Sequence, residues 1–171
     1  MKYLLLYTAL VLSSITPVNS QIIYSDTVYA RYNIQGDLKS GFYYATPDTS
    51  KSGFKVYNND KYYFIGKAPV VTMEEVDTIY KQYQSFMQRY VLIFKFNKKA
   101  TKNWSDFTER YQNREVALFL RDTLVFVATV AGQITNGTSW LAGDHSEKEL
   151  DDFKAKFEKE IRKAKNPGLT F

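Results

Sequence analysis

The side chains best suited to catalysis are those of the adjacent Asp144, His145 and Ser146, which lie in a loop before the last expected helix. A carboxylate, an imidazole and a hydroxyl make up a nucleophilic triad, but in a triad they converge from separate segments with distinct roles. We therefore interpret His145, the only histidine, as solvent-facing or as part of a helix cap. With one histidine and no cysteine, a zinc site has too few ligands. We expect no catalytic residue, no metal and no cofactor.

Two acidic pairs, Glu74-Glu75 and Asp151-Asp152, are the remaining candidates for general acid and base chemistry. Each pair falls in the first turn of an expected helix, where carboxylates interact favourably with the helix dipole. We interpret both pairs as structural. A carboxylate-dependent hydrolase stays open as an alternative, because two acids converging in a deep pocket, or Asp144 and His145 joined by a distant nucleophile, would support it.

The first twenty residues predict export from the cytoplasm. Lys2, the apolar run Tyr3–Leu12 and the small or polar residues Ser13–Ser20 are typical of a secretory signal peptide over residues 1–20, cut between Ser20 and Gln21. No later segment approaches the ~20 uninterrupted apolar residues of a membrane span. Because cysteine is absent, apolar packing must hold the fold. We expect a soluble periplasmic or extracellular protein with no integral membrane segment after cleavage.

The charge pattern gives no indication of a nucleic-acid partner. The formal net charge is +5, and removal of Lys2 with the signal peptide lowers it to +4. Lysines cluster in Lys95–Lys102 and Lys154–Lys165, but the second cluster alternates with acidic residues, which is typical of a solvated helix face. No stripe of one sign accompanies a recognisable nucleic-acid motif.

The chain from Gln21 to Ile65 is rich in tyrosine and β-branched residues broken by turn formers, which indicates strands. We expect one strand over Ile22–Tyr32, another over Lys39–Ala45, and a hairpin of Phe54–Tyr57 with Tyr62–Ile65. The polar stretch Thr46–Ser52 is the best candidate for an internal boundary, although it is too short for a linker.

Helical periodicity follows. Thr72 and Glu75 have capping-box spacing, and apolar residues at helical intervals predict a helix over Met73–Arg89. The strand Tyr90–Phe96 leads to Asn97, which can cap a second helix. The apolar positions assigned to the first helix are Val76, Ile79, Tyr80, Tyr83, Met87 and Tyr90.

The remaining elements are a hairpin, a turn and a helix. The strands Glu115–Arg121 and Leu124–Val130 are joined so tightly that they should pair antiparallel. Gln133–Gly143 should hold a turn at Asn136-Gly137-Thr138 and a short edge strand. Ser146 and Glu149 again have capping-box spacing before a final amphipathic helix. We predict an α+β fold in which about three helices pack on an antiparallel sheet, with an N-terminal β-rich extension.

Several segments in the second half, taken in order, carry a family resemblance. Lys67–Thr72 is similar to a Lys-Pro-hydrophobic-Thr segment of one known family. The same family has a strand that runs through Phe-Asn into a helix, and Leu92–Phe96 with Asn97 is similar to it. Asn113–Asp122 is similar to a Gly-Lys/Arg-x-hydrophobic-Ala-Ile-Val-Leu-Asp-Gly hairpin. Ile134–Gly137 is similar to an Ile-Thr-Gly-Gly turn. Over residues 61–163 the chain resembles the head subdomain of the first periplasmic domain of SecD/SecDF, a membrane component of the bacterial protein-export machinery.

The resemblance implies a head-like fold and a binding surface. Thr123 stands where the family has a turn glycine, and Thr129 replaces a proline. The family carries its head between transmembrane helices, which we do not expect in this mature chain, so translocase activity is not carried over. We divide the chain into a signal peptide (residues 1–20), a β-rich extension (21–60) and a SecDF head-like domain (61–171).

We predict a non-catalytic binding module of the cell envelope whose partner is a polypeptide or another envelope component. It would bind by strand addition at an open sheet edge or by docking on an aromatic surface. A structural or inhibitory envelope protein is a further alternative. The candidate binding residues are Tyr43, Tyr44, Tyr62, Tyr63, Asn136, Gly137 and Trp140.

Overall fold

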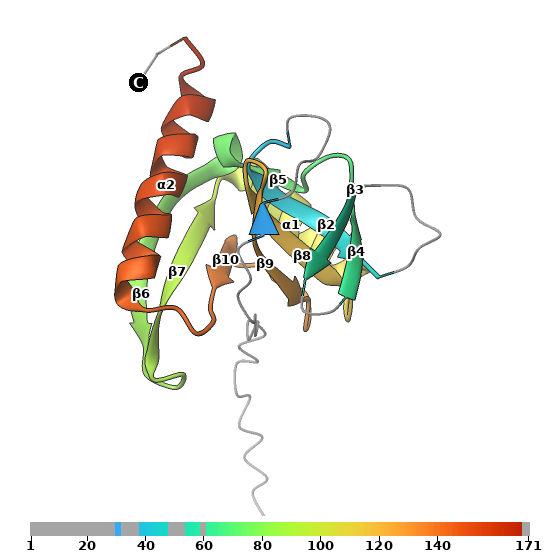
Figure 1. Cartoon of the computed structure of the whole chain (residues 1–171), viewed down its shortest axis with the longest axis horizontal. Helices are drawn as coiled ribbons and strands as arrows, with labels where there is room; N and C mark the ends of the chain where they lie inside the picture. The colour runs from blue at the N-terminus through green and yellow to red at the C-terminus, as the bar shows by residue number, and fades with distance from the viewer. Residues whose placement is uncertain (1–29, 32–37, 48–53, 59–60, 169–171) are drawn as a thin grey trace, which may run out of the picture.

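Two antiparallel sheets and two α-helices make up the structure (Figure 1). The computed structural model describes residues 30–31, 38–47, 54–58 and 61–168. The expected mixture of antiparallel sheet and helix is confirmed. The expected number of helices is corrected, because the described residues contain two α-helices and not three.

The larger sheet has seven strands, in the order β1-β9-β8-β2-β4-β3, with β5 also paired to β2. The expected hairpins β3–β4 and β8–β9 both form, and every pairing is antiparallel. Gly41 lets β5 approach closely, since a Cβ there would lie 2.6 Å from the carbonyl oxygen of Val71. The strands are β1 (Ala30–Arg31), β2 (Gly41–Thr46), β3 (Phe54–Asn58), β4 (Lys61–Ile65), β5 (Val71–Thr72), β8 (Glu115–Leu120) and β9 (Thr123–Thr129).

The smaller sheet has three strands in the order β10-β7-β6. They are β6 (Val76–Gln84), β7 (Arg89–Phe96) and β10 (Thr138–Leu141). The strand expected before Asn97 and the short edge strand expected after Gly137 are both confirmed. A tight hairpin joins β6 to β7, so β6 forms one edge of this sheet and β10 the other.

The expected helix Met73–Arg89 is wrong. Thr72 and Glu75 do form a capping box, but it closes a single 3-10 turn, η1 (Met73–Glu75), after which the chain extends into β6. A β-bulge between Val76 and Thr78 inserts one residue, so the buried Val76 and Ile79 lie three positions apart on one face. That spacing imitates a helical period.

The two helices begin at the expected caps. In α1 (Lys98–Arg110) the Asn97 side chain accepts a hydrogen bond from the backbone N–H of Ala100 at 2.9 Å. In α2 (Glu147–Lys165) the Ser146 hydroxyl and the Glu149 carboxylate form a capping box. The helix α2 packs on β6 and η1, and to a lesser extent on β7 (Figure 1).

Strand alternation divides the interior into two main clusters. Phe42 of β2 and Leu118 of β8 face a cluster shared with α1, α2 and the smaller sheet. Their neighbours Tyr43 and Phe119 face a second cluster beneath the β3–β4 hairpin. The centre of the larger sheet is therefore buried on both faces.

Some expectations fall on residues outside the described ones. These are the signal peptide, most of the strand expected over Ile22–Tyr32 and most of the stretch Thr46–Ser52. The division at residue 60 stays a prediction. Among the described residues, neither helix is both long enough and apolar enough to cross a membrane.

Candidate functional site

Exposed aromatic side chains concentrate on the β6–β7 hairpin. Of the four large apolar side chains exposed among the described residues, Tyr80 (39%), Tyr83 (46%) and Phe86 (54%) belong to this hairpin, and Tyr62 lies on β4. Trp140 of β10 is half-buried and lies beside Phe86, with 6.3 Å between ring centroids. We call Tyr80, Tyr83, Phe86 and Trp140 the aromatic hairpin surface.

Strand register places two of these rings on the sheet face opposite α2. Tyr80 of β6 and Trp140 of β10 both pair with Ile93 of β7, so the three side chains form one row across the sheet. Beneath Trp140 lies a small buried cluster of Val91, Ile93 and Ala142. The helix α2 packs on the other face, through residues such as Phe157 against Phe94.

Tyr83 faces the α2 side of the same hairpin. It pairs with Tyr90, and the two rings meet edge to face at 5.2 Å. On this face Lys81 binds Asp151 at 2.8 Å and Glu147 at 3.5 Å, which ties β6 to the first turns of α2. The hydrogen bond to Asp151 is the main cause that raises the pKa of Lys81. Aromatic side chains therefore stand on both faces of the hairpin.

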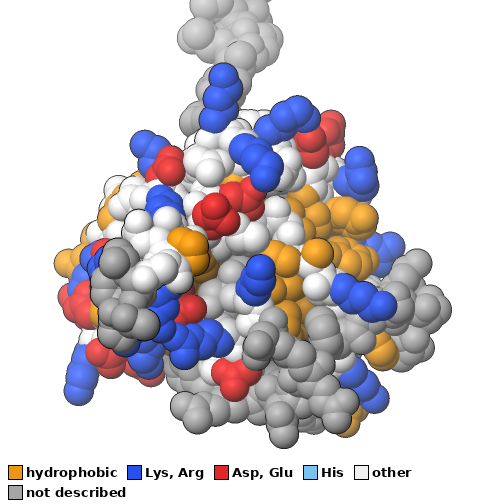
Figure 2. All heavy atoms as spheres, turned by 90° about the horizontal axis from the view of Figure 1, so that it is seen from above, with side chains coloured by type: hydrophobic (Ala, Val, Ile, Leu, Met, Phe, Trp, Pro, Cys, Tyr) orange, Lys and Arg blue, Asp and Glu red, His pale blue; other side chains and the backbone are white. Residues whose placement is uncertain are grey.

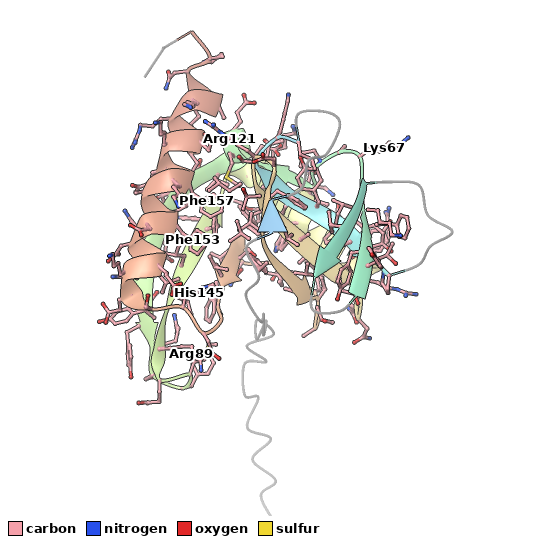
Figure 3. The ribbon with its side chains drawn as sticks, in the orientation of Figure 1. Lys67, Arg89, Arg121, His145, Phe153 and Phe157 are labelled. Atoms are coloured by element: carbon pink, nitrogen blue, oxygen red, sulfur yellow. The ribbon has the colours of Figure 1, made fainter. Side chains whose placement is uncertain are left out.

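Arg89 joins the hairpin to the loop that follows β10. Its guanidinium donates to the Gly143 carbonyl at 3.1 Å and to the Asp144 carboxylate at 2.8 Å. Figure 3 shows Arg89 at the lower end of the hairpin, below His145. Asp144 is thus engaged in an ion pair with Arg89.

His145 is more buried than a solvent-facing loop residue. Its ring packs edge to face on Phe153 of α2, with 5.6 Å between ring centroids. In Figure 3, His145 lies below Phe153 and Phe157, which follow one another along α2. Within the described residues both ring nitrogens are buried and lack a hydrogen-bond partner. Burial lowers the pKa of His145, against the opposing charges of Glu149 and Asp144. The expectation of solvent exposure is corrected.

The four candidate tyrosines do not form one surface. Tyr43 (1% exposed) and Tyr63 (8%) are buried in the larger sheet, and burial raises the pKa of Tyr43 to about 12. Their expected exposure is corrected, because both side chains belong to the buried cluster that covers their own face of the sheet. Tyr44 is half-buried against Tyr111. Tyr62 remains exposed, on a different sheet from Trp140.

Asn136 and Gly137 build the turn before β10, as expected for this motif. The Asn136 carboxamide oxygen accepts hydrogen bonds from the backbone N–H and the hydroxyl of Thr138, at 3.1 and 3.0 Å. Gly137 has φ +69°, and a Cβ there would collide with Thr101 of α1. The Gly137 carbonyl also accepts from the N–H of Phe96 at 2.8 Å. These contacts give both residues a structural role.

One member of each acidic pair is engaged in structural contacts. Glu75 belongs to the η1 capping box and binds Lys99 at 3.1 Å, and Asp151 binds Lys81. A groove of about 820 Å³ between α2 and the β8–β9 turn holds further acids, among them Glu149 and Glu160. Glu149 caps α2, as described above. The carboxylates named here therefore already have partners.

Glu160 forms the best-connected ion pair at this groove. It accepts from Arg121 at 2.7 and 3.0 Å and from the Ser40 hydroxyl at 3.3 Å. Burial acts to raise the pKa of Glu160, but Arg121, Lys163 and Ser40 outweigh it and hold the pKa below its usual value. Figure 2 shows basic and acidic side chains interspersed on the face seen from above, with no field of one sign.

Sequence reasoning missed three members of the aromatic hairpin surface. Tyr80 and Tyr83 belong to the apolar positions of the expected helix, and Phe86 lies outside that pattern. A usable signal was present, because Val76, Thr78 and Tyr80 favour a strand over a helix. Trp140 was included, and its expected place on an edge strand is confirmed.

Comparison with known proteins adds a family and a fold. The sequence model of the SecDF P1 head subdomain matches residues 47–158, more than half of the chain. A crystal structure of SecDF in a super-membrane-facing form matches with TM-score 0.52 and 16% identity, over 68% of this chain and 18% of that one. A structure described as a membrane component SecDF that enhances protein export matches with TM-score 0.51 and 15% identity, over 70% and 62%. No curated protein matches. The chain thus spans less than two thirds of either SecDF chain.

Proposed function

Because this chain belongs to the SecDF P1 head subdomain family, we propose that it is a non-catalytic interaction module linked to protein export. It acts on the outer side of the cytoplasmic membrane, after removal of a signal peptide over residues 1–20. Its partner is an exported polypeptide in an unfolded state. The residues of the N-terminal extension complete the head domain, since β2 pairs with both β8 and β4.

The aromatic hairpin surface is the observation that carries this proposal. Tyrosine and tryptophan offer large apolar rings with polar tips, and they lose little conformational entropy on binding. Tyr80, Tyr83 and Phe86 are exposed together on one hairpin, whereas the tyrosines at the centre of the larger sheet are buried. Rings of this kind bind apolar side chains of many sequences, which suits a partner that varies.

The test compares an unfolded polypeptide with its folded form. A fluorescently labelled protein, reduced and alkylated so that it stays unfolded, is titrated with the purified chain and followed by fluorescence anisotropy. We expect the unfolded form to bind and the native form of the same protein not to bind. Binding of the native form alone would contradict the proposal and favour an inhibitory or structural role.

Matched variants locate the binding surface. We expect the double variant Tyr80→Ser with Phe86→Ser to weaken binding about tenfold, because exposed aromatic anchors carry most of the energy at interfaces. Tyr62→Ser is the control, since Tyr62 is equally exposed (52%) but lies on the larger sheet. An equal loss in both variants would place binding elsewhere.

A further inference from the structure

The outer edge of β6 is the longest strand edge in the described part of the chain that pairs with no other strand. From Thr78 to Gln84, β6 pairs with β7 over seven consecutive residues without a register shift, and no described strand lies on its other side. In an edge strand, alternate backbone N–H and C=O groups point away from the sheet. An edge of this length therefore offers several hydrogen bonds to a further strand.

The usual protection of edge strands is weak in β6. Proteins block their edges with short strands, prolines, bulges or outward-pointing lysines. The other sheet edges in the described residues are shorter: β1 has 2 residues, β10 has 4 and β3 has 5, against 9 in β6. The bulge of β6 lies at its start, before Thr78. Its one lysine, Lys81, is held on the α2 face by Asp151.

Two tyrosine side chains of β6 point to opposite faces of the sheet. Tyr80 shares the face opposite α2 with Ile93, and Tyr83 shares the α2 face with Tyr90. At about 3.3 Å per residue they are ~10 Å apart along the strand. A strand added to β6 would therefore have one tyrosine ring beside each of its two side-chain rows.

We propose that an extended segment of the bound polypeptide adds to the β6 edge as a fourth strand of the smaller sheet. This inference rests on the proposed function and specifies how the partner is held. Backbone hydrogen bonds supply binding energy that does not depend on the side chains of the bound segment. Tyr80 and Tyr83 contact apolar side chains of that segment, one on each face of the sheet. A chain in an extended conformation can replace the water at several of these backbone groups at once.

A bare segment fits this edge better than a second copy of the chain. The helix α2 packs on β6 and on the η1 turn that precedes it. Two copies joined through β6 in antiparallel fashion would place both α2 helices on the same face, side by side over the new strand pair. The acidic residues at the start of each α2, including Glu147 and Asp151, would then lie near those of the other copy.

The test uses backbone methylation of a peptide probe. A short fluorescein-labelled peptide of alternating threonine and valine is compared with a form methylated at alternate amide nitrogens and one methylated at every amide nitrogen. The alternate form keeps one complete hydrogen-bonding edge and should still bind. Full methylation removes the donors on both edges, and we expect a loss on the order of 100-fold. Equal affinity of all three peptides would overturn strand addition.

Cysteine chemistry then locates the peptide. The chain has no cysteine, so Gln82→Cys introduces a single thiol on exposed β6, and Lys67→Cys is the matched control at a distant exposed site (Figure 3). A peptide whose single cysteine is activated as a mixed disulfide with thionitrobenzoate should exchange with the thiolate of Gln82→Cys, releasing thionitrobenzoate, at least tenfold faster than with that of Lys67→Cys. Equal rates would overturn the assignment to β6.

These outcomes separate the inference from the function on which it rests. If the unfolded polypeptide binds but the methylated peptides bind equally well, polypeptide binding stands and strand addition fails. If neither the unfolded polypeptide nor any peptide binds, the proposed function itself fails. A further outcome is that the protein without peptide has the molecular mass of a dimer, and that labelling the thiol of Gln82→Cys restores the mass of a monomer. This would show that a second copy occupies the edge, which contradicts the inference.

Discussion

Tyrosines from the two sheets lie in opposite environments. In the larger sheet Tyr43 and Tyr63 point into a buried cluster, and the Tyr43 hydroxyl donates to the Lys39 carbonyl at 2.7 Å. In the smaller sheet Tyr80 lies on the face opposite α2 and Tyr83 on the α2 face, and both remain exposed. The comparison teaches that the number of tyrosines in this chain says little about binding. What decides their role is whether other residues cover the side chain itself on the face to which it points.

The largest expected effect contrasts two tyrosines directly. Tyr43→Ala should lower the free energy of unfolding by about 3 to 5 kcal/mol, because it leaves a cavity in the core of the larger sheet. Tyr80→Ala should cost no more than about 1 kcal/mol, because its ring is partly in water. Urea denaturation followed by circular dichroism measures both. Similar losses in the two variants would remove the distinction between the sheets.

A second variant breaks the turn that carries β10 to the edge of the smaller sheet. Gly137→Ala should destabilise the protein by about 2 to 3 kcal/mol, because alanine resists the positive φ and its Cβ collides with Thr101. Gly168→Ala is the control, since a Cβ there has no atom within 4 Å. Thermal melts of both variants check this, and equal melting temperatures would contradict it.

A third variant removes an ion pair between the larger sheet and α2, formed by Arg121 in the β8–β9 turn and Glu160. Arg121→Met should cost about 0.5 to 1 kcal/mol at pH 7, since the guanidinium is largely exposed. The lowered pKa of Glu160 means that this contribution is present above the ordinary carboxyl pKa of 4.5 and is lost as the pH falls through the lowered native pKa.

Denaturation of Arg121→Met at several pH values measures the contribution of this ion pair. The difference from the unchanged protein should shrink steadily below pH 4.5. Lys102→Met is the control, because its pair with Asp106 lies on the exposed face of α1 and joins no sheets. A difference that stays constant between pH 7 and pH 3 would show that Arg121 stabilises by packing alone.

The smallest expected effect concerns His145 beneath α2. Because burial lowers its native pKa, the unfolded chain takes up the proton first, and stability falls as the pH drops from 6.5 through the native pKa. His145→Phe keeps the ring beside Phe153 and removes the titration. Between pH 7.5 and pH 5.5 the variant should lose less stability than the unchanged protein, by below about 1 kcal/mol. Parallel losses would exclude His145 as the cause.

Local sequence signals predicted the elements that depend on neighbouring residues. Asn97 and Ser146 mark their helices because a cap is made within three positions, and the β8–β9 hairpin follows from two apolar runs with a short join. The expected helix failed because a capping box reports only the first turn. The bulge after Val76 then reproduced a helical spacing within a strand.

The candidate site was only partly predictable for a different reason. Trp140 was found because glycines and a short segment indicate an edge strand. Tyr43 and Tyr80 cannot be distinguished by type, and their exposure depends on which layers pack on each strand. That packing joins residues far apart in the sequence, such as β2 with β8, and no local pattern contains it.

One aromatic cluster has a consequence for the whole molecule. The ring of Phe42 in the larger sheet packs on Phe94 of the smaller sheet and on Trp104 of α1, with 5.3 and 5.2 Å between ring centroids. Since these rings share one interior, neither sheet can open without exposing the same apolar surface. The slowest amide protons of β2 and β7 should therefore exchange with solvent at a common rate, as parts of a single cooperative unit.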